Sequence, residues 1–171
     1  MCSSDLSLLF DLPLAEIDVV IHRESIVHSL VSYIDGSCIA QMGNPDMRTP
    51  IAHALAWPDR VESGVAPLAI DQLGKLHFEP VSADRFPCLN LARQAAAAGQ
   101  AAIICLNAAN EVAVQAFLDE LISFTDIPLV IAEALEQTSM CEVHTIAAVM
   151  EQDRKARDTA GAVCERIQNK A

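Results

Sequence analysis

The sequence is poor in aromatic residues and in basic residues. Phe, Trp and Tyr make up 4% of its 171 residues, and 11 Lys and Arg stand against 23 Asp and Glu, for a formal net charge of −12. Such a chain repels the phosphate backbone of nucleic acids and anionic membrane surfaces. The shortage of aromatics also leaves no platform on which bases could stack. We therefore expect neither nucleic acid nor membrane as a partner.

Clustered cysteines and clustered glycines are missing as well. The six cysteines stand singly, with no Cys-x-x-Cys pair, which excludes a zinc framework and a dense disulfide scaffold. Most lie in apolar stretches, where a reduced thiol behaves as a small hydrophobic group, so we expect a cytoplasmic protein. The six glycines are scattered, so no phosphate-binding glycine loop is encoded. The first residues lack the features of a secretory signal.

Apolar residues, by contrast, are plentiful. A hydrophobic share of 52% is enough for a core and excludes a disordered or collagen-like chain. The length fits one ordinary domain or two small ones. The most apolar window, residues 95–109, is interrupted by Gly99, Gln100 and Asn107, so it is interpreted as a buried helix and not as a membrane span.

The first part of the chain is predicted to be a sheet, because it is rich in β-branched residues. Short apolar runs over residues 17–21, 27–34 and 37–42 favour strands. Asp35-Gly36 between the second and third runs predicts a hairpin in which both turn residues take positive φ. One more short strand is expected over residues 76–79.

A helix and an irregular connection follow the hairpin. Thr49 as N-cap and Pro50 at the first helical position predict a helix that ends at Trp57, because Pro58 comes next. Residues 59–74, which include glycines and a proline, are interpreted as the connection between two structural units.

Everything after Asp84 has the pattern of helices. Asp84 is a candidate N-cap, and Gly99 a left-handed stop, for the first of them. Further helices are expected over about 101–122, 125–137, 143–150 and 153–168. The second should bury one stripe, formed by Leu106, Ala109, Ala113, Phe117 and Leu121. The predicted class is α+β, a partial mixed sheet followed by a small C-terminal helical bundle.

Histidines near the predicted strands are the first candidates for chemistry. His22 and His28 flank Ser25, but only Glu24 supplies a nearby carboxylate and two imidazoles six residues apart share no helix face, so a hydrogen-bonding role outweighs a metal site. His53 and His77 are expected to be partly exposed polar residues.

The loop before the predicted helix at Pro50 has two interpretations. Met47 either lies on the lip of an anion-binding pocket at the free amides of that helix, or fills a gap beside a capped turn, and the residues alone favour the second.

Two asparagines, Asn107 and Asn110, share a face of an otherwise apolar helix. They either tie the bundle to the sheet or mark a helix break. No cysteine has a His or Asp at a spacing that suggests a nucleophile. From the residues alone, the chain is a soluble, acidic sheet-plus-bundle protein without a complete active site.

A series of short motifs is spread along the chain. They are Val19-Val20-Ile21-His22 with Ser25, His28-Ser29, Asp35-Gly36-Ser37, Pro45-Asp46-Met47-Arg48-Thr49-Pro50-Ile51, Trp57-Pro58, Arg85-Phe86-Pro87-Cys88-Leu89, Leu106-Asn107-Ala108-Ala109-Asn110-Glu111 and Phe124-Thr125-Asp126-Ile127. In their order and spacing these motifs resemble those of the 1-deoxy-D-xylulose 5-phosphate reductoisomerases, and the resemblance runs from about Leu9 to the C-terminus.

The resemblance implies an NADPH-dependent oxidoreductase and isomerase of the non-mevalonate (MEP) route to isoprenoids. Such an enzyme converts the phosphosugar 1-deoxy-D-xylulose 5-phosphate to 2-C-methyl-D-erythritol 4-phosphate with a divalent metal (Mg²⁺, Mn²⁺ or Co²⁺), as a homodimer. The family's dinucleotide loop, its Asp-Ser-Glu segment and its Asn-Lys-Gly-x-Glu segment all precede the part that this chain resembles. We therefore expect the chain alone to bind neither NADPH nor metal and to be inactive.

The same resemblance assigns a few positions. It implies that Ser25, His28 and Met47 form part of the wall of the substrate and cofactor pocket, with no catalytic residue or metal ligand in this chain. Arg23-Glu24 departs from the family, which commonly has Pro after the first His. That departure concerns the turn and not the three pocket positions.

The resemblance also divides the chain. Residues 9–75 correspond to the end of the catalytic and dimerisation domain with a linker, and residues 76–171 to the C-terminal helical domain. Residues 1–8 are expected to be an artefactual N-terminus, since Met-Cys-Ser-Ser-Asp-Leu can be encoded as GTG TGC TCT TCC GAT CT, the end of a common sequencing adapter. The alternative function is a stand-alone dimerisation or interaction module without catalysis, and an independent histidine metal site ranks below both.

Overall fold

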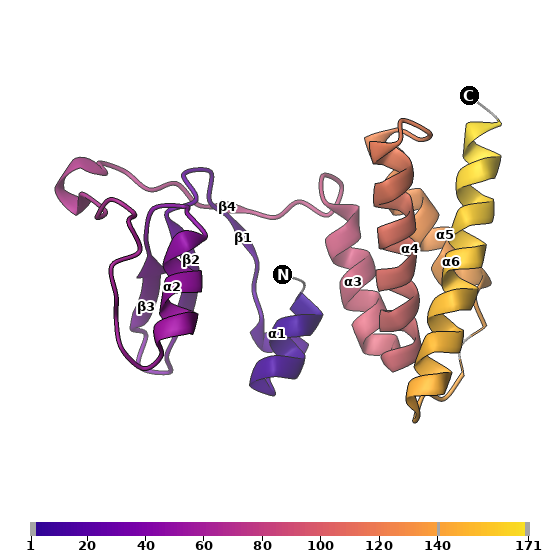
Figure 1. Ribbon diagram of the computed structural model, residues 1–171, viewed down its shortest axis with the longest axis horizontal. Helices are drawn as coiled ribbons and strands as arrows, with labels where there is room; N and C mark the ends of the chain where they lie inside the picture. The colour runs from indigo at the N-terminus through magenta and orange to yellow at the C-terminus, as the bar shows by residue number, and fades with distance from the viewer. Residues whose placement is uncertain (1–2, 140, 170–171) are drawn as a thin grey trace. The chain divides into compact units, whose positions relative to one another are not determined.

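The computed structural model describes residues 3–139 and 141–169 and confirms the α+β class (Figure 1). The chain forms two compact units. The sheet unit is residues 19–81, and the helical unit is residues 3–18 together with the described residues from 82 onward. The predicted division between residues 75 and 76 concerns the domains of the family and stays a prediction.

The sheet unit contains two antiparallel strand pairs. β2 (Val27–Ser32) pairs with β3 (Cys38–Met42), and β1 (Val20–Ile21) pairs with β4 (Glu79–Pro80). β1 and β4 are shorter than the strands predicted over residues 17–21 and 76–79, and β4 also lies further along the chain. Pro80 stands opposite Val20 and has no N–H to extend the ladder. In the described residues both ladders are antiparallel, so the parallel pairs of a mixed sheet are absent from this part of the chain.

The hairpin between β2 and β3 lies where the Asp35-Gly36 signal places it, but its turn differs from the predicted one. The Gly36 N–H donates to the Tyr33 carbonyl at 3.0 Å, so Ile34 and Asp35 are the central turn residues and only Gly36 takes positive φ, at +85°. The Asp35 carboxylate accepts from the Ser37 N–H at 2.9 Å, which stabilises the turn without a left-handed Asp. Positive φ at Asp35 was therefore a wrong expectation.

α2 (Arg48–Ala56) begins two residues before the predicted start. Asp46, and not Thr49, satisfies a free amide of its first turn, accepting from the Arg48 N–H at 2.9 Å. The helix ends at Ala56, one residue before the predicted end at Trp57, and residues 59–74 are irregular apart from a 3₁₀ turn, Ile70–Gln72.

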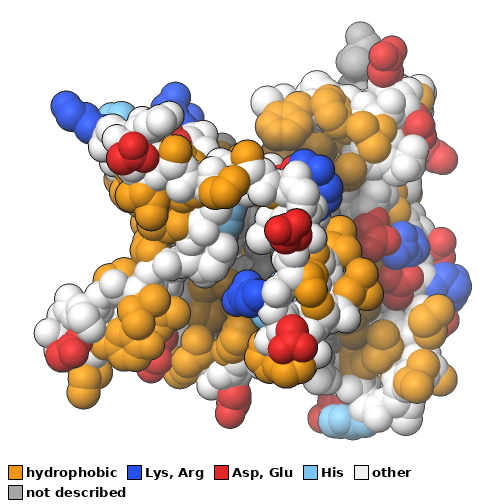
Figure 2. Space-filling view, turned by 60° about the vertical axis from the view of Figure 1, so that its left-hand side comes forward, with side chains coloured by type: hydrophobic (Ala, Val, Ile, Leu, Met, Phe, Trp, Pro, Cys, Tyr) orange, Lys and Arg blue, Asp and Glu red, His pale blue; other side chains and the backbone are white. Residues whose placement is uncertain are grey.

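No residue of the sheet unit is buried. Several large apolar side chains on or next to its strands and helix are more than half exposed, among them Val31, Ile39, Leu55 and Trp57. Figure 2 shows hydrophobic side chains over much of the face that it presents. A unit without a buried residue has little hydrophobic stabilisation of its own.

The helical unit is a bundle of four helices: α3 (Pro87–Ala98), α4 (Gln100–Leu118), α5 (Ile127–Gln137) and α6 (Ile146–Gln168). Its shorter elements are α1 (Ser3–Phe10), a 3₁₀ turn (Leu14–Glu16) and a second 3₁₀ turn (Phe124–Asp126) just before α5. α4 packs against α3, α5 and α6, and α1 packs against α3. The artefactual origin of residues 1–8 stays a prediction, and residues 1–2 lie outside the described part.

Several predicted helix ends need correction. α3 begins at Pro87 with Phe86 as N-cap, so Asp84 is not its cap, whereas Gly99 does end it with φ +109°. Residues 146–168 form one helix, not two. Its N-cap is Thr145, whose hydroxyl accepts from the Ala148 N–H.

The core of the bundle is built largely from alanine. The buried positions of α4 are Ala101, Ala102, Cys105, Ala108, Ala109, Ala113 and Ala116. The predicted stripe therefore holds only at Ala109 and Ala113, because the larger Leu106 and Phe117 pack at the margin and Leu121 is exposed. Small residues at the centre let the helix axes approach closely.

α4 is long and apolar enough to cross a membrane by length and composition alone. In the structure it is the central helix of the bundle, with Cys105, Ala108 and Ala113 completely buried. That is the environment of a core helix, although the window predicted as one buried helix, residues 95–109, is divided at Gly99 between α3 and α4.

Candidate active-site wall

The three predicted pocket residues flank one end of the β2–β3 hairpin. Ser25 precedes β2, His28 lies in β2, and Met47 follows β3. The Gly43 N–H donates to the Ile26 carbonyl at 3.0 Å, which brings the start of β2 beside the loop that carries Met47. The hairpin thus gathers residues about twenty positions apart at the same end of the ladder.

His28 occupies a β-bulge. Val27 pairs with Met42 and Ser29 with Gln41, so His28 is the extra residue on its strand. A Cβ added at Gly43 would lie 3.9 Å from His28 Nε2, which places the imidazole next to the Gly43 backbone. Bulges often redirect a side chain beside a functional site.

Met47 lies in a loop whose flanking residues, Asn44, Asp46 and Arg48, are fixed by hydrogen bonds and an ion pair. Arg48 and Asp46 form a two-point ion pair, with Nη2 to Oδ2 at 2.7 Å and Nε to Oδ1 at 3.1 Å, and the guanidinium lowers the pKa of the Asp46 carboxyl. The Asn44 side chain donates to the Ala66 carbonyl at 2.7 Å. The Met47 side chain itself is 70% exposed and fills no gap, so the gap-filling interpretation is wrong.

Ser25 has a left-handed backbone, with φ +53°, and its N–H donates to the His22 carbonyl at 3.1 Å. No hydrogen bond joins the Ser25, His28 and Met47 side chains in the part of the chain that the structure describes. The three residues line a surface and do not form a catalytic triad.

His22 pairs with His77 and not with His28. Its Nδ1 lies 2.8 Å from the His77 carbonyl oxygen and 3.0 Å from Glu24, while His77 Nδ1 lies 2.5 Å from Glu24. The sequence analysis missed this cluster, because the two histidines are 55 residues apart and no local pattern links them. Over residues 3–139 and 141–169, no three His, Cys, Asp or Glu side chains are arranged to hold a metal ion.

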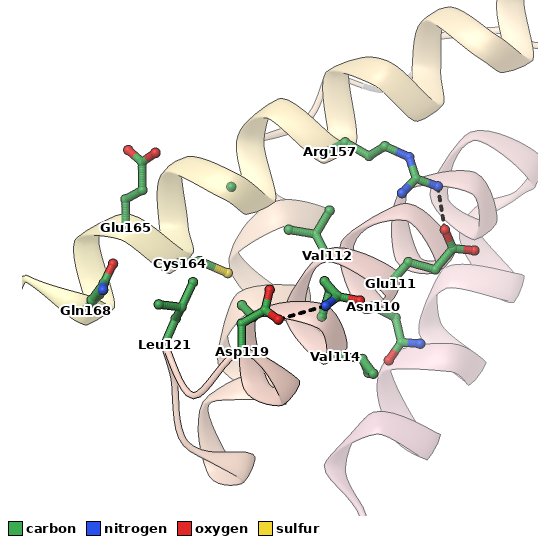
Figure 3. A pocket seen from close by; sticks show the side chains of 13 residues that line it. Asn110, Glu111, Val112, Val114, Asp119, Leu121, Arg157, Cys164, Glu165 and Gln168 are labelled. Carbon is green, nitrogen blue, oxygen red and sulfur yellow. Dashed lines mark hydrogen bonds and ion pairs between the residues drawn. The ribbon is translucent and has the colours of Figure 1, made fainter.

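The helical unit has a separate cavity of about 760 Å³ between α4 and α6 (Figure 3). Arg157 of α6 reaches across to Glu111 of α4, 2.6 Å away, and also pairs with Asp153 at 2.7 Å. Two carboxylates thus neutralise the arginine and raise its pKa. Among the described residues that line this cavity, none offers a free positive charge for a phosphate group.

The two asparagines of α4 do not break the helix, which continues through both of them. The Asn107 side chain donates to Glu111 one turn further on, at 3.0 Å, and Asn110 lines the cavity in Figure 3. The five cysteines of the described residues are all free thiols, as expected. Burial raises the pKa of Cys105 and Cys164, which makes nucleophilic roles for them unfavourable.

The chain thus combines a unit built on a β-hairpin with a unit built as a helical bundle. Residues 42–159 match the family model described as DXP reductoisomerase C-terminal domain. The chain belongs to this family.

Known proteins agree with this membership in sequence and in fold. The 1-deoxy-D-xylulose 5-phosphate reductoisomerase of Ectopseudomonas mendocina (strain ymp) is 57% identical over 153 residues, which are 90% of this chain and 39% of that protein. The Zymomonas mobilis enzyme, solved in complex with NADPH, is 41% identical with a TM-score of 0.86, over 93% of this chain and 42% of that one.

A DOX-P reductoisomerase solved with NADPH, fosmidomycin and magnesium is also similar. It is 49% identical with a TM-score of 0.83, and the match covers 93% of this chain and 41% of that chain. The chain thus spans about 40% of the length of the proteins that it matches.

Proposed function

We propose that this chain supplies the C-terminal part of a 1-deoxy-D-xylulose 5-phosphate reductoisomerase. The observation that carries the proposal is the 57% identity to the Ectopseudomonas mendocina enzyme over nine-tenths of the chain. In the intact protein, Ser25, His28 and Met47 would form one wall of the pocket for the phosphosugar and NADPH. The bulge at His28 and the held loop around Met47 support this assignment, since both present a side chain at a fixed place.

The dinucleotide-binding loop and the metal ligands are assigned to residues outside this chain. The described residues supply neither, because they contain no metal-holding cluster and the glycines are scattered. We therefore infer that the isolated chain turns over no substrate. The reduced cysteines support a cytoplasmic location.

A homodimer is the proposed assembly of the intact protein. The sheet unit supports it, because its strands and helix carry large apolar side chains and bury none of them. A second copy or the rest of the protein would remove that surface from water.

The experiment joins this chain to the N-terminal part of the Ectopseudomonas mendocina enzyme. NADPH oxidation is measured with 1-deoxy-D-xylulose 5-phosphate and Mg²⁺ for the joined protein, the isolated chain and the complete relative. We expect turnover from the joined protein and none from the isolated chain. Turnover by the isolated chain, or an inactive joined protein beside an active relative, would refute the proposal, and the second result would favour the interaction module.

The pocket assignment is tested in the same joined protein. His28→Gln removes the imidazole from the wall, whereas His144→Gln changes an exposed histidine of the helical unit. A loss of kcat/KM of at least about tenfold is expected for the first variant only. Equal activity of the two variants would remove His28 from the pocket.

A further inference from the structure

The His22, Glu24 and His77 cluster connects two segments that are far apart in the sequence. Glu24 faces both imidazoles, with Oε2 3.0 Å from His22 Nδ1 and Oε1 2.5 Å from His77 Nδ1. The His77 N–H also donates to Glu24, at 3.4 Å. One carboxylate therefore joins the turn after β1 to the residues just before β4.

The two acceptors beside His22 Nδ1 fix the tautomer of the His22 ring. Its Nδ1 lies between the His77 carbonyl oxygen and the Glu24 carboxylate, and both of these groups only accept hydrogen bonds. Nδ1 must therefore carry the proton. The ring is fixed further by stacking on Phe78, with centroids 4.7 Å apart, and the His22 side chain is only 6% exposed.

A second link lies beside the first. Arg23 donates from Nε to Glu79 at 2.8 Å and from Nη2 at 3.3 Å. The charged and titratable groups of this cluster are therefore His22, Arg23 and Glu24 on one segment and His77 and Glu79 on the other. Arg23 and Glu79 pair as opposite charges, and the Glu24 carboxylate faces the imidazoles of both His22 and His77, so each segment fixes the other.

The turn that these links hold leads directly into Ser25. A left-handed φ is unfavourable for a residue with a Cβ and persists only where its surroundings enforce it. The Ser25 N–H donates to the His22 carbonyl, so the positions of His22 and Glu24 determine where the backbone of Ser25 lies. β2 and its bulged His28 follow within three residues.

We propose that Glu24 and His77 are positioning residues, which hold the turn at residues 22–25 against residues 77–79 and so set the place of Ser25 and His28. The assignment of Ser25 and His28 to a pocket rests on the proposed function, whereas the positioning itself is a property of this chain. Neither Glu24 nor His77 is assigned a catalytic step.

The test measures hydrogen exchange on the 171-residue chain and needs no activity. Glu24→Gln and His77→Gln are each compared with the parent chain, with the double variant, and with Glu142→Gln. The control changes another His–Glu pair, Glu142 with His144 at 3.3 Å, in which both side chains are mostly exposed. We expect exchange in residues 22–28 to become at least about tenfold faster in either single variant.

The outcome depends on where exchange changes and how the effects combine. The double variant should exchange no faster than Glu24→Gln alone, because the Glu24–His77 link that His77→Gln removes is already lost in that variant. Protection in residues 88–98 of α3 should not change, and the control should leave residues 22–28 untouched. Unchanged exchange at 22–28 in Glu24→Gln, additive effects in the double variant, or a parent chain without protection there would each overturn the proposal.

Kinetics of the joined enzyme give a second readout. Glu24→Gln should lower kcat at saturating substrate, because Ser25 and His28 are misplaced while the cofactor and metal sites are intact. A merely structural contact would lower the amount of folded enzyme but leave kcat per folded molecule unchanged. If the joined parent enzyme proves inactive, the proposed function fails while the exchange result still decides the positioning.

Discussion

Truncation of Ile131 measures how much the bundle depends on α5. Ile131 is 2% exposed and belongs to the apolar core with Val130 and Val163, whereas Leu129 on the same helix is 59% exposed. Ile131→Ala removes about three methylene equivalents at ~0.8 kcal/mol each, roughly 2.4 kcal/mol of transfer free energy. The cavity adds to this, so we expect a loss of about 3 kcal/mol in the free energy of unfolding.

The assay is urea unfolding followed by far-ultraviolet circular dichroism, which reports mainly on the helices of the bundle. Leu129→Ala is the matched control, and its effect should stay within about 0.5 kcal/mol. The denaturant midpoint should fall for Ile131→Ala with little change in the slope. A loss below about 1 kcal/mol for Ile131→Ala, or an equal loss for Leu129→Ala, would refute this description of the core.

Three further measurements address single groups. Gln152 is completely buried, donates to the Ser139 carbonyl and accepts from the Cys141 thiol, so Gln152→Ala should lower the free energy of unfolding by about 1–3 kcal/mol, and an unchanged urea midpoint would contradict this. Buried Cys105 should resist a thiol reagent until the bundle unfolds, whereas exposed Cys38 reacts at once; equal labelling, read by mass spectrometry, would contradict this. Hydrogen bonds from His77 and the backbone hold the pKa of Glu24 at about 2. Because its folded pKa is depressed, the stability it contributes is present above its ordinary pKa and is lost as the pH falls toward 2, which an NMR titration of the carboxyl group checks; an ordinary value would contradict it.

Local signals predicted the features that local chemistry determines. Gly99 ends α3 because only glycine takes φ +109° without strain. The hairpin follows from Asp35-Gly36 between two β-branched runs, although the turn needs positive φ only at Gly36. α5 was expected within two residues of its observed bounds, since its start is set by residues that are close in sequence.

The buried face of α4 could not be read from residue size. The predicted stripe gave the largest side chains the deepest positions, but close packing against α5 and α6 reserves the centre for Ala108, Ala109 and Ala113. Leu106 and Phe117 therefore pack at the edge of the core. Which face of an alanine-rich helix is buried depends on its partners, and those partners are not recorded in its own periodicity.

The extent of α6 differs from the two helices expected over residues 143–150 and 153–168. The expected break falls on a polar run, Glu151 to Asp153. In the structure Gln152 is the buried residue of this run, and its amide anchors the segment between α5 and α6 through the Ser139 carbonyl. A polar residue that satisfies a neighbouring segment has the same sequence signature as a polar residue in a loop, so only the tertiary contact separates the two cases.

The candidate site combines residues that sequence motifs identify with residues that only tertiary contacts bring together. Ser25, His28 and Met47 were found through motifs shared with a family, whereas Glu24 belongs to the departure from that family and His77 lies in none of the motifs. Their link depends on a return of the chain after more than fifty residues, so it exists only once β1 and β4 have paired.

If the Glu24–His77 link positions Ser25, a chain with the family's usual proline after the first histidine must hold the same turn by other contacts. In that case Arg23→Pro combined with Glu24→Gln should restore slow exchange at residues 22–28 relative to Glu24→Gln alone, because proline restricts the turn directly. Exchange as fast as in the single variant would show that the proline and the ion-paired turn are not equivalent solutions.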